Sequence, residues 1–177
     1  MIESQLVILQ QANTYLAAVT EAQYTEVISP MFMSSAGAHM RHILDHYQSV
    51  INGFSEGLID YDKRSRGGVV ESCPKAAQAA IKEIGVFLQS LTPEQLATSV
   101  KLSTEISVVD KQVAMVDTTL AREVIFVGSH TVHHLATIKH IAQVQEVDIE
   151  RDLGIAPATA TFLRAEVSYV YINLSID

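Results

Sequence analysis

The chain contains little cysteine and no long uninterrupted apolar segment, and each of these absences excludes a class of protein. One cysteine in 177 residues cannot form an internal disulfide, which fits a protein of the reducing cytoplasm. No run of about 18 apolar residues is present, so we expect no transmembrane helix. The first residues lack the basic and then apolar pattern of a secretory signal, so we expect a cytoplasmic location.

Positive charge is also scarce. Twelve basic residues face 20 acidic ones, which gives a net charge of −8 and a pI near 5.3. This balance argues against a nucleic-acid backbone or an anionic membrane surface as a partner. The length and the 48% content of hydrophobic residues instead predict one globular domain over residues 1–177 with a buried core.

Apolar residues recur at helical spacing in four long segments. The spacing predicts helices over residues 6–19, about 34–58, 72–91 and about 118–147. Serine and proline at the starts of the second and third segments are typical of helix N-termini.

The segment between the third and fourth predicted helices has a period of two residues instead of the helical period. Apolar and polar residues alternate over 100–107, and residues 113–116 return the chain, which predicts a β-hairpin. The fold class expected is therefore all-α, a four-helix bundle with a small β-hairpin between helices three and four. A short helix is expected over 158–165. The β-branched and aromatic tail (166–177) is atypical, and we expect either a third strand beside the hairpin or a partner-facing segment.

Six of the seven histidines fall in two short clusters. His130 and His134 are four residues apart, so their side chains lie one above the other on one helix face, where they can bind one metal ion. His133 and His140 point to a different flank. The second predicted helix carries the other cluster, which consists of His39, His42 and His46.

Two helices that each supply histidines can complete a metal site between them. Helical periodicity places His39 and His46 nearer the core than His42, and therefore favours His46 or His39 as the third ligand. Neutral imidazole suits Zn²⁺, Ni²⁺ or Fe²⁺. Three such ligands leave an open position, as in catalytic sites. The alternative is a set of core histidines without a metal.

One carboxylate lies on the same face of the fourth predicted helix. Glu123 precedes His130 by seven residues, which is about 10.5 Å of helical rise and too far for a shared ion. We expect Glu123 to pair with a cation instead.

Both histidine motifs resemble those of the DinB/YfiT-like superfamily. The segment 37–47 (GAHMRHILDHY) resembles its helix-two motif, and the segment 129–134 (SHTVHH) resembles its helix-four motif. The segments 60–62 and 154–159 also fit the order of that family. The resemblance extends to about residue 165.

The resemblance implies an up-down-down-up bundle with a three-histidine metal site. The helix-two ligand in such families is the histidine followed three residues later by aspartate, which matches His42 with Asp45. The helix-four ligands match His130 and His134. On this ground the predicted metal ligands are His42, His130 and His134, with His46 as the second choice in place of His42.

Related families activate a low-molecular-weight thiol on the metal. They include thiol-dependent S-transferases, a mycothiol-dependent isomerase and the metal-binding domain of enzymes that build ergothioneine. The resemblance thus implies a divalent-metal-dependent S-transferase or a related hydrolase that acts on a small molecule, with no catalytic side chain assigned. The alternative is a non-catalytic metal-binding stress or interaction protein. Homodimerisation is a further expectation.

Overall fold

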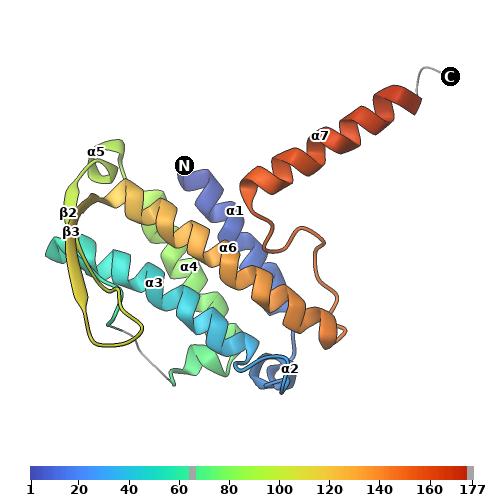
Figure 1. The fold of residues 1–177 in the computed structure, drawn as a ribbon, viewed down its shortest axis with the longest axis horizontal. Coiled ribbons are helices and arrows are strands. Elements are labelled where there is room, and N and C mark those ends of the chain that lie inside the picture. The colour runs from blue at the N-terminus through green and yellow to red at the C-terminus, as the bar shows by residue number, and fades with distance from the viewer. Residues whose placement is uncertain (64–66, 175–177) are drawn as a thin grey trace.

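The computed structural model describes residues 1–63 and 67–174, with the side chains of 166–174 left out of the description (Figure 1). In chain order its elements are α1 (Ile2–Ala18), α2 (Glu21–Thr25), α3 (Ala36–Glu56), β1 (Leu58–Asp60), a 3₁₀ turn (Val69–Glu71), α4 (Pro74–Ser90), α5 (Pro93–Leu96), β2 (Ser99–Glu105), β3 (Val113–Thr119), α6 (Leu120–Val144) and α7 (Pro157–Leu174). No helix in these ranges is long and apolar enough to cross a bilayer.

The four predicted long helices are present as α1, α3, α4 and α6. Local signals set where two of them begin. The Ser35 hydroxyl caps α3 by accepting from the backbone N–H of Ala38 at 3.1 Å, and Thr119 caps α6 by accepting from that of Arg122 at 3.3 Å. The short helices α2 and α5, each of which begins with a capping box, were not predicted.

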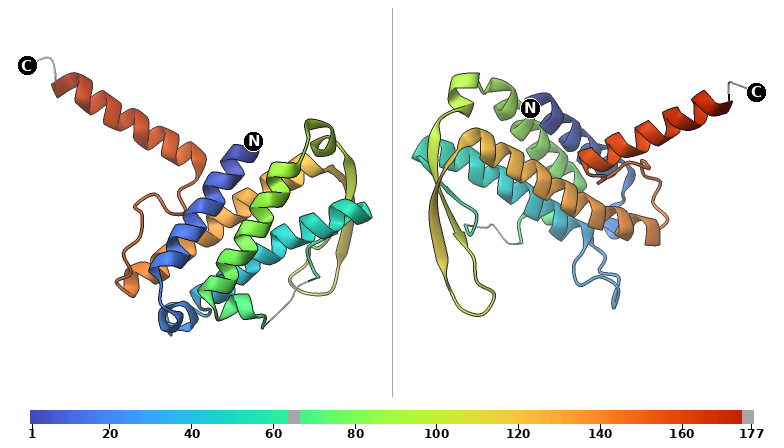
Figure 2. Two further views of the ribbon diagram at one scale, coloured as in Figure 1. Left: turned by 180° about the vertical axis from the view of Figure 1, so that it is seen from behind. Right: turned by 45° about the horizontal axis from the view of Figure 1, so that its top comes forward.

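Helices α1, α3, α4 and α6 pack on one another around the core (Figure 2). Helix α3 contacts both α4 and α6, and α1 contacts α4 and α6 from the other side. The core consists of apolar side chains from all four helices, among them Leu9, Ala12, Ile43, Ala77, Leu88, Leu135 and Ile138. The chain is thus mostly helical, as expected, although the described part has seven α-helices rather than four.

The predicted hairpin is confirmed as the antiparallel pair of β2 and β3, in which Leu102 lies opposite Val116. A third strand completes the sheet, but it is β1 and not the C-terminal tail. Strand β1 runs parallel to β2, with Ile59 opposite Leu102. Three residues are too few for the period-two pattern to reveal a strand in the sequence.

Of the two expectations for the tail, the third strand is wrong over residues 167–174, and the partner-facing segment stays a prediction. These residues continue α7, which projects away from the other helices in both figures. A helix satisfies its backbone hydrogen bonds within itself, whereas a strand needs a neighbour to pair with, so the β-branched composition did not decide the conformation. Residues 175–177, the last three of the tail, lie outside the described residues.

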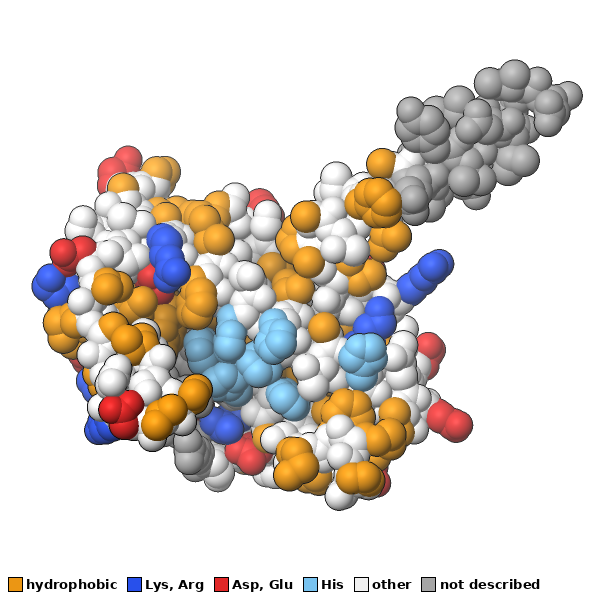
Figure 3. Space-filling model, in the orientation of Figure 1, with side chains coloured by type: hydrophobic (Ala, Val, Ile, Leu, Met, Phe, Trp, Pro, Cys, Tyr) orange, Lys and Arg blue, Asp and Glu red, His pale blue; other side chains and the backbone are white. Residues whose placement is uncertain are grey.

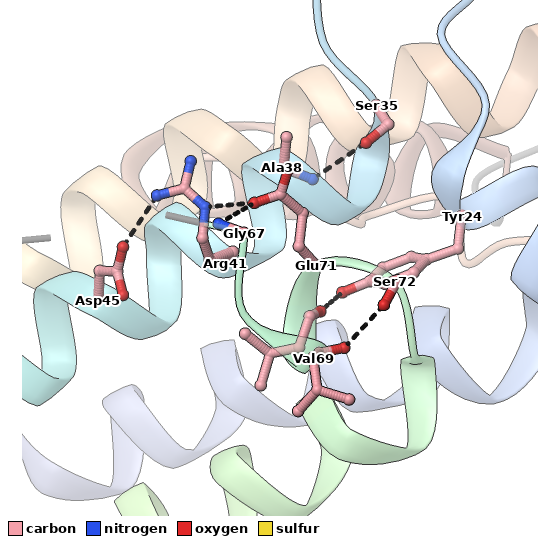
Figure 4. A network of polar contacts seen from close by, with 10 residues as sticks. Tyr24, Ser35, Ala38, Arg41, Asp45, Gly67, Val69, Glu71 and Ser72 are labelled. Carbon is pink, nitrogen blue, oxygen red and sulfur yellow. Dashed lines mark hydrogen bonds and ion pairs between the residues drawn. The ribbon is translucent and has the colours of Figure 1, made fainter. Parts of the chain in front are cut away.

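A network of polar contacts holds the segment before α4 against α3 (Figure 4). The Arg41 guanidinium donates to Asp45 at 2.9 Å and to Glu71 at 2.8 Å, and the Tyr24 hydroxyl donates to the Val70 carbonyl at 2.7 Å. Since Arg41 lies between the histidines of α3, this network fixes the part of the helix that carries them.

The close approach of β1 to α3 depends on Gly53, and this yields a stability prediction. A Cβ atom at Gly53 would lie 2.6 Å from the Cα of Ile59, so Gly53→Ala forces backbone to move. We expect this substitution to lower the free energy of unfolding by about 1–3 kcal/mol in urea denaturation.

The matched control is Gly85→Ala in α4, where the added Cβ would meet only the Leu6 side chain at 3.8 Å. Alanine is the better helix former, so this variant should gain about 0.5–1 kcal/mol. Equal effects of the two substitutions would contradict the packing described for Gly53.

Candidate metal centre

Five histidine side chains meet where α3 packs against α6. Helix α3 supplies His39, His42 and His46 over two turns, and α6 supplies His130 and His134 over one turn. The space-filling view shows most of the visible histidine surface gathered in one patch, with one smaller histidine group apart from it (Figure 3). Residues about ninety positions apart in the sequence thereby form one cluster.

The three predicted ligands lie together in this cluster. The Nε2 atom of His130 is 3.0 Å from Nε2 of His42 and 3.1 Å from Nε2 of His134. The ring centroids of His42 and His134 are 4.6 Å apart. Two nitrogens bound to one tetrahedral zinc ion are about 3.3 Å apart, given Zn–N bonds of about 2.0–2.1 Å. The two Nε2–Nε2 distances at His130 are close to this value, so small side-chain adjustments would bring them to it.

His46 also belongs to the cluster. Ring nitrogens of His42, His46 and His130 all lie within 4.8 Å of one another, so these three residues form a second candidate ligand set. The Nδ1 atom of His46 donates to the His42 carbonyl at 3.0 Å, because a carbonyl can only accept. This leaves the lone pair of neutral His46 on Nε2.

The periodicity argument is confirmed for His46, which is buried, with 6% of its surface exposed. Periodicity also placed His39 nearer the core than His42, but the structure shows both side chains half-buried. His39 contacts the cluster through His134, with 3.0 Å between the two Nδ1 atoms. His133 is exposed on α6, and its ring centroid lies 5.1 Å from that of His134.

Burial and crowding keep His134 uncharged. The pKa of His134 is lowered to about 3, first by desolvation and then by repulsion from the neighbouring histidines, of which His130 contributes most. Desolvation also lowers the pKa of His39. A neutral imidazole offers a lone pair to a cation, so the donor set fits a divalent metal.

Asp45, the aspartate of the family motif, is held in an ion pair with Arg41 at 2.9 Å, with 14% of each side chain exposed. The structure gives this carboxylate a partly buried structural role beside His42 and His46 in α3.

Two aromatic rings form a wall beside the cluster. The ring of Tyr61 stacks on His46 with centroids 5.0 Å apart, and the ring of Phe126 stacks on His130 with centroids 5.9 Å apart. The guanidinium carbon of Arg122 lies 5.1 Å from the Phe126 centroid. Sequence reasoning missed both aromatic residues, although Phe126 precedes His130 by one helical turn.

A buried carboxylate, Glu123, contacts Tyr61 and holds it in place. Glu123 is fully buried and accepts hydrogen bonds from Tyr61 at 2.8 Å, Thr118 at 2.7 Å and Arg122 at 2.8 Å. The prediction that Glu123 pairs with a cation is confirmed by its ion pair with Arg122. Because Tyr61 follows β1 and Glu123 lies in α6, this contact ties the sheet to the helix that carries two of the histidines.

We predict that Glu123→Ala lowers the free energy of unfolding by about 2–4 kcal/mol, since it leaves the Tyr61 and Thr118 hydroxyls without their acceptor. Glu123→Gln should cost less, because the amide oxygen still accepts and the Tyr61 hydroxyl can turn to accept from the amide N–H. Urea denaturation measures both. Glu83→Ala, at an exposed position of α4, should change the free energy by no more than about 0.5 kcal/mol. A loss at Glu123 as small as that at Glu83 would contradict the support described.

Comparison with solved structures finds the same fold in DinB-like proteins of two bacilli. The chain superposes on a DinB-like protein from Bacillus subtilis with a TM-score of 0.64 and 15% sequence identity, covering 86% of this chain and 96% of that one. For a DinB-like protein from Bacillus cereus the TM-score is 0.55 at 11% identity, covering 81% and 89%. These identities are low, so the two likenesses show the fold alone.

Sequence comparison adds a fungal relative and a family. The chain is 27% identical over 109 residues to FK506-binding protein 5 of Rhizopus delemar, and the match covers 62% of this chain but 28% of that protein. The sequence model of the DinB superfamily matches residues 8–138, which include both histidine clusters. From this match over most of its length, the chain belongs to the DinB superfamily.

Proposed function

We propose that this protein is a divalent-metal-dependent enzyme that activates a low-molecular-weight thiol, or water, for transfer to a small electrophile. The expected activity is that of a thiol-dependent S-transferase or a related hydrolase. The observation that carries the proposal is that Nε2 of His130 in α6 lies 3.0 Å from Nε2 of His42 in α3 and 3.1 Å from Nε2 of His134 in α6.

We assign the metal to His42, His130 and His134. The Nε2 atoms of His42 and His134 both face Nε2 of His130, and one divalent cation would satisfy all three lone pairs at once. His46 is the second choice for the third ligand, because its ring nitrogen also lies within reach of His42 and His130. Imidazole ligands suit zinc, nickel and iron alike.

Three neutral ligands leave a coordination position open for the reactant. A bound divalent metal acts there as a Lewis acid that favours the deprotonated thiol or water. The protein side chains shape the surroundings. Tyr61 and Phe126 place apolar ring surface next to His46 and His130, which limits access of bulk water from that side.

The first prediction of this proposal concerns metal content. Wild-type protein incubated with Zn²⁺ and desalted should retain close to one equivalent by mass spectrometry. His42→Ala and His130→Ala should retain little, because each loses a ligand common to both candidate sets. His140→Ala is the matched control, since His140 is exposed on α6 and contacts Gln143 at 3.3 Å.

The same measurement identifies the third ligand. His134→Ala should lose the metal while His46→Ala keeps it. The reverse result would replace His134 by His46, and full zinc retention by His130→Ala would contradict the site altogether.

The second prediction concerns activity. Zinc-, nickel- or iron-loaded protein should accelerate the reaction of cysteine or glutathione with an alkyl halide, and His130→Ala should fall to the uncatalysed rate. If the loaded protein matches His130→Ala with every thiol and metal while keeping its ion, the enzymatic proposal fails and the non-catalytic metal-binding function takes its place.

Three expectations from the family resemblance remain predictions. These are the up-down-down-up order of α1, α3, α4 and α6, a homodimeric state, and a small-molecule substrate. Sedimentation analysis of the full chain tests the second of them directly.

A further inference from the structure

His39 stands outside both candidate ligand sets, yet it makes a close contact with one of the assigned ligands. It lies one turn before His42 on α3, and its Nδ1 atom is 3.0 Å from Nδ1 of His134. In the described chain the other ring nitrogen of His134, Nε2, is 3.1 Å from Nε2 of His130. His134 therefore has a different histidine at each nitrogen.

The position of the protons follows from the chemistry of imidazole. A neutral histidine carries one N–H, and the nitrogen without hydrogen is the acceptor. If Nε2 of His134 offers its lone pair to the metal, the hydrogen of His134 is on Nδ1. It then points at Nδ1 of His39, which must accept and carry its own hydrogen on Nε2.

We propose that His39 is a positioning residue that accepts this hydrogen bond and thereby fixes the tautomer and ring orientation of His134 for metal binding. The inference rests on the proposed function and adds a fourth histidine to the working site. Metal-bound histidines generally donate their second N–H to an oriented acceptor, and losing that acceptor costs about 10–100-fold in metal affinity.

The start of α3 holds His39 in place for this role. Its backbone N–H donates to the Ser35 carbonyl at 3.2 Å, and the Ser35 hydroxyl caps the same turn through Ala38 at 3.1 Å. Two residues further on, Arg41 is fixed by Asp45 and Glu71. The acceptor is thus attached to an anchored part of the helix.

An imidazole acceptor differs from a carboxylate in one respect that matters for the site. It fixes the tautomer without adding negative charge next to the metal. Asp45, the nearest acidic residue along α3, is already paired with Arg41. His39 would therefore orient His134 without changing the net charge of the donor set.

The test compares two substitutions of His39 with a matched control. His39→Leu removes the acceptor, whereas His39→Asn places an amide oxygen close to the former Nδ1 position and restores it. His133→Leu is the matched control, since the exposed His133 ring also lies next to that of His134, with centroids 5.1 Å apart, but in the described residues no hydrogen bond joins the two side chains. Circular dichroism confirms that each variant is folded before zinc affinity is measured by competition with a chromophoric chelator.

We expect His39→Leu to bind one zinc ion about 10–100-fold more weakly than wild type. His39→Asn should recover most of the affinity, and His133→Leu should match wild type. Long-range ¹H–¹⁵N spectra of the zinc-loaded wild type should show the hydrogen of His134 on Nδ1.

Two results would overturn the role of His39 while leaving the proposed metal site intact. One is wild-type affinity in His39→Leu. The other is a second zinc equivalent in wild type that His39→Leu loses, which would make His39 a ligand. A wild type that binds no zinc would instead overturn the proposed function, so the two failures are distinguishable.

Discussion

The packing of α3 against α6 is the constraint on which the rest of the site depends. Each helix alone presents two or three imidazoles along one face, and neither can surround an ion by itself. When the apolar residues between those histidines are buried, the Nε2 atoms of His42 and His130 come to 3.0 Å. Hydrophobic burial of these neighbouring residues therefore supplies the free energy that brings the polar ligands together.

Other side chains around the cluster also hold the histidines in place. Tyr61 reaches His46 from the sheet, Phe126 reaches His130 from one turn earlier on α6, and buried Glu123 ties the two elements together. The ion pair between Arg41 and Glu71 fixes the first turns of α3. Side chains held in this way need little rearrangement to bind an ion, which is what a preorganised site requires.

The helices were largely predictable because they are amphipathic and two of them begin with residues typical of helix N-termini, Ser35 before α3 and Pro74 in α4. The tail was not, since the β-branched residues after 166 favour a strand only where a neighbouring strand can pair with them. Within the site, the spacing of His130 and His134 gave the helix face, and the family motif named His42. Helical phase also placed His46 in the core. What the sequence could not show was Tyr61 against His46, because that contact joins segments fifteen residues apart through a three-residue strand.

The central claim is that imidazoles from α3 and α6 hold one divalent ion with a position left for a reactant. X-ray absorption spectroscopy of the zinc-loaded wild-type protein tests it most directly. The account predicts imidazole scattering from three histidines at about 2.0–2.1 Å and one further light ligand. An ion surrounded by oxygen alone, or one with fewer than two imidazoles, would contradict it.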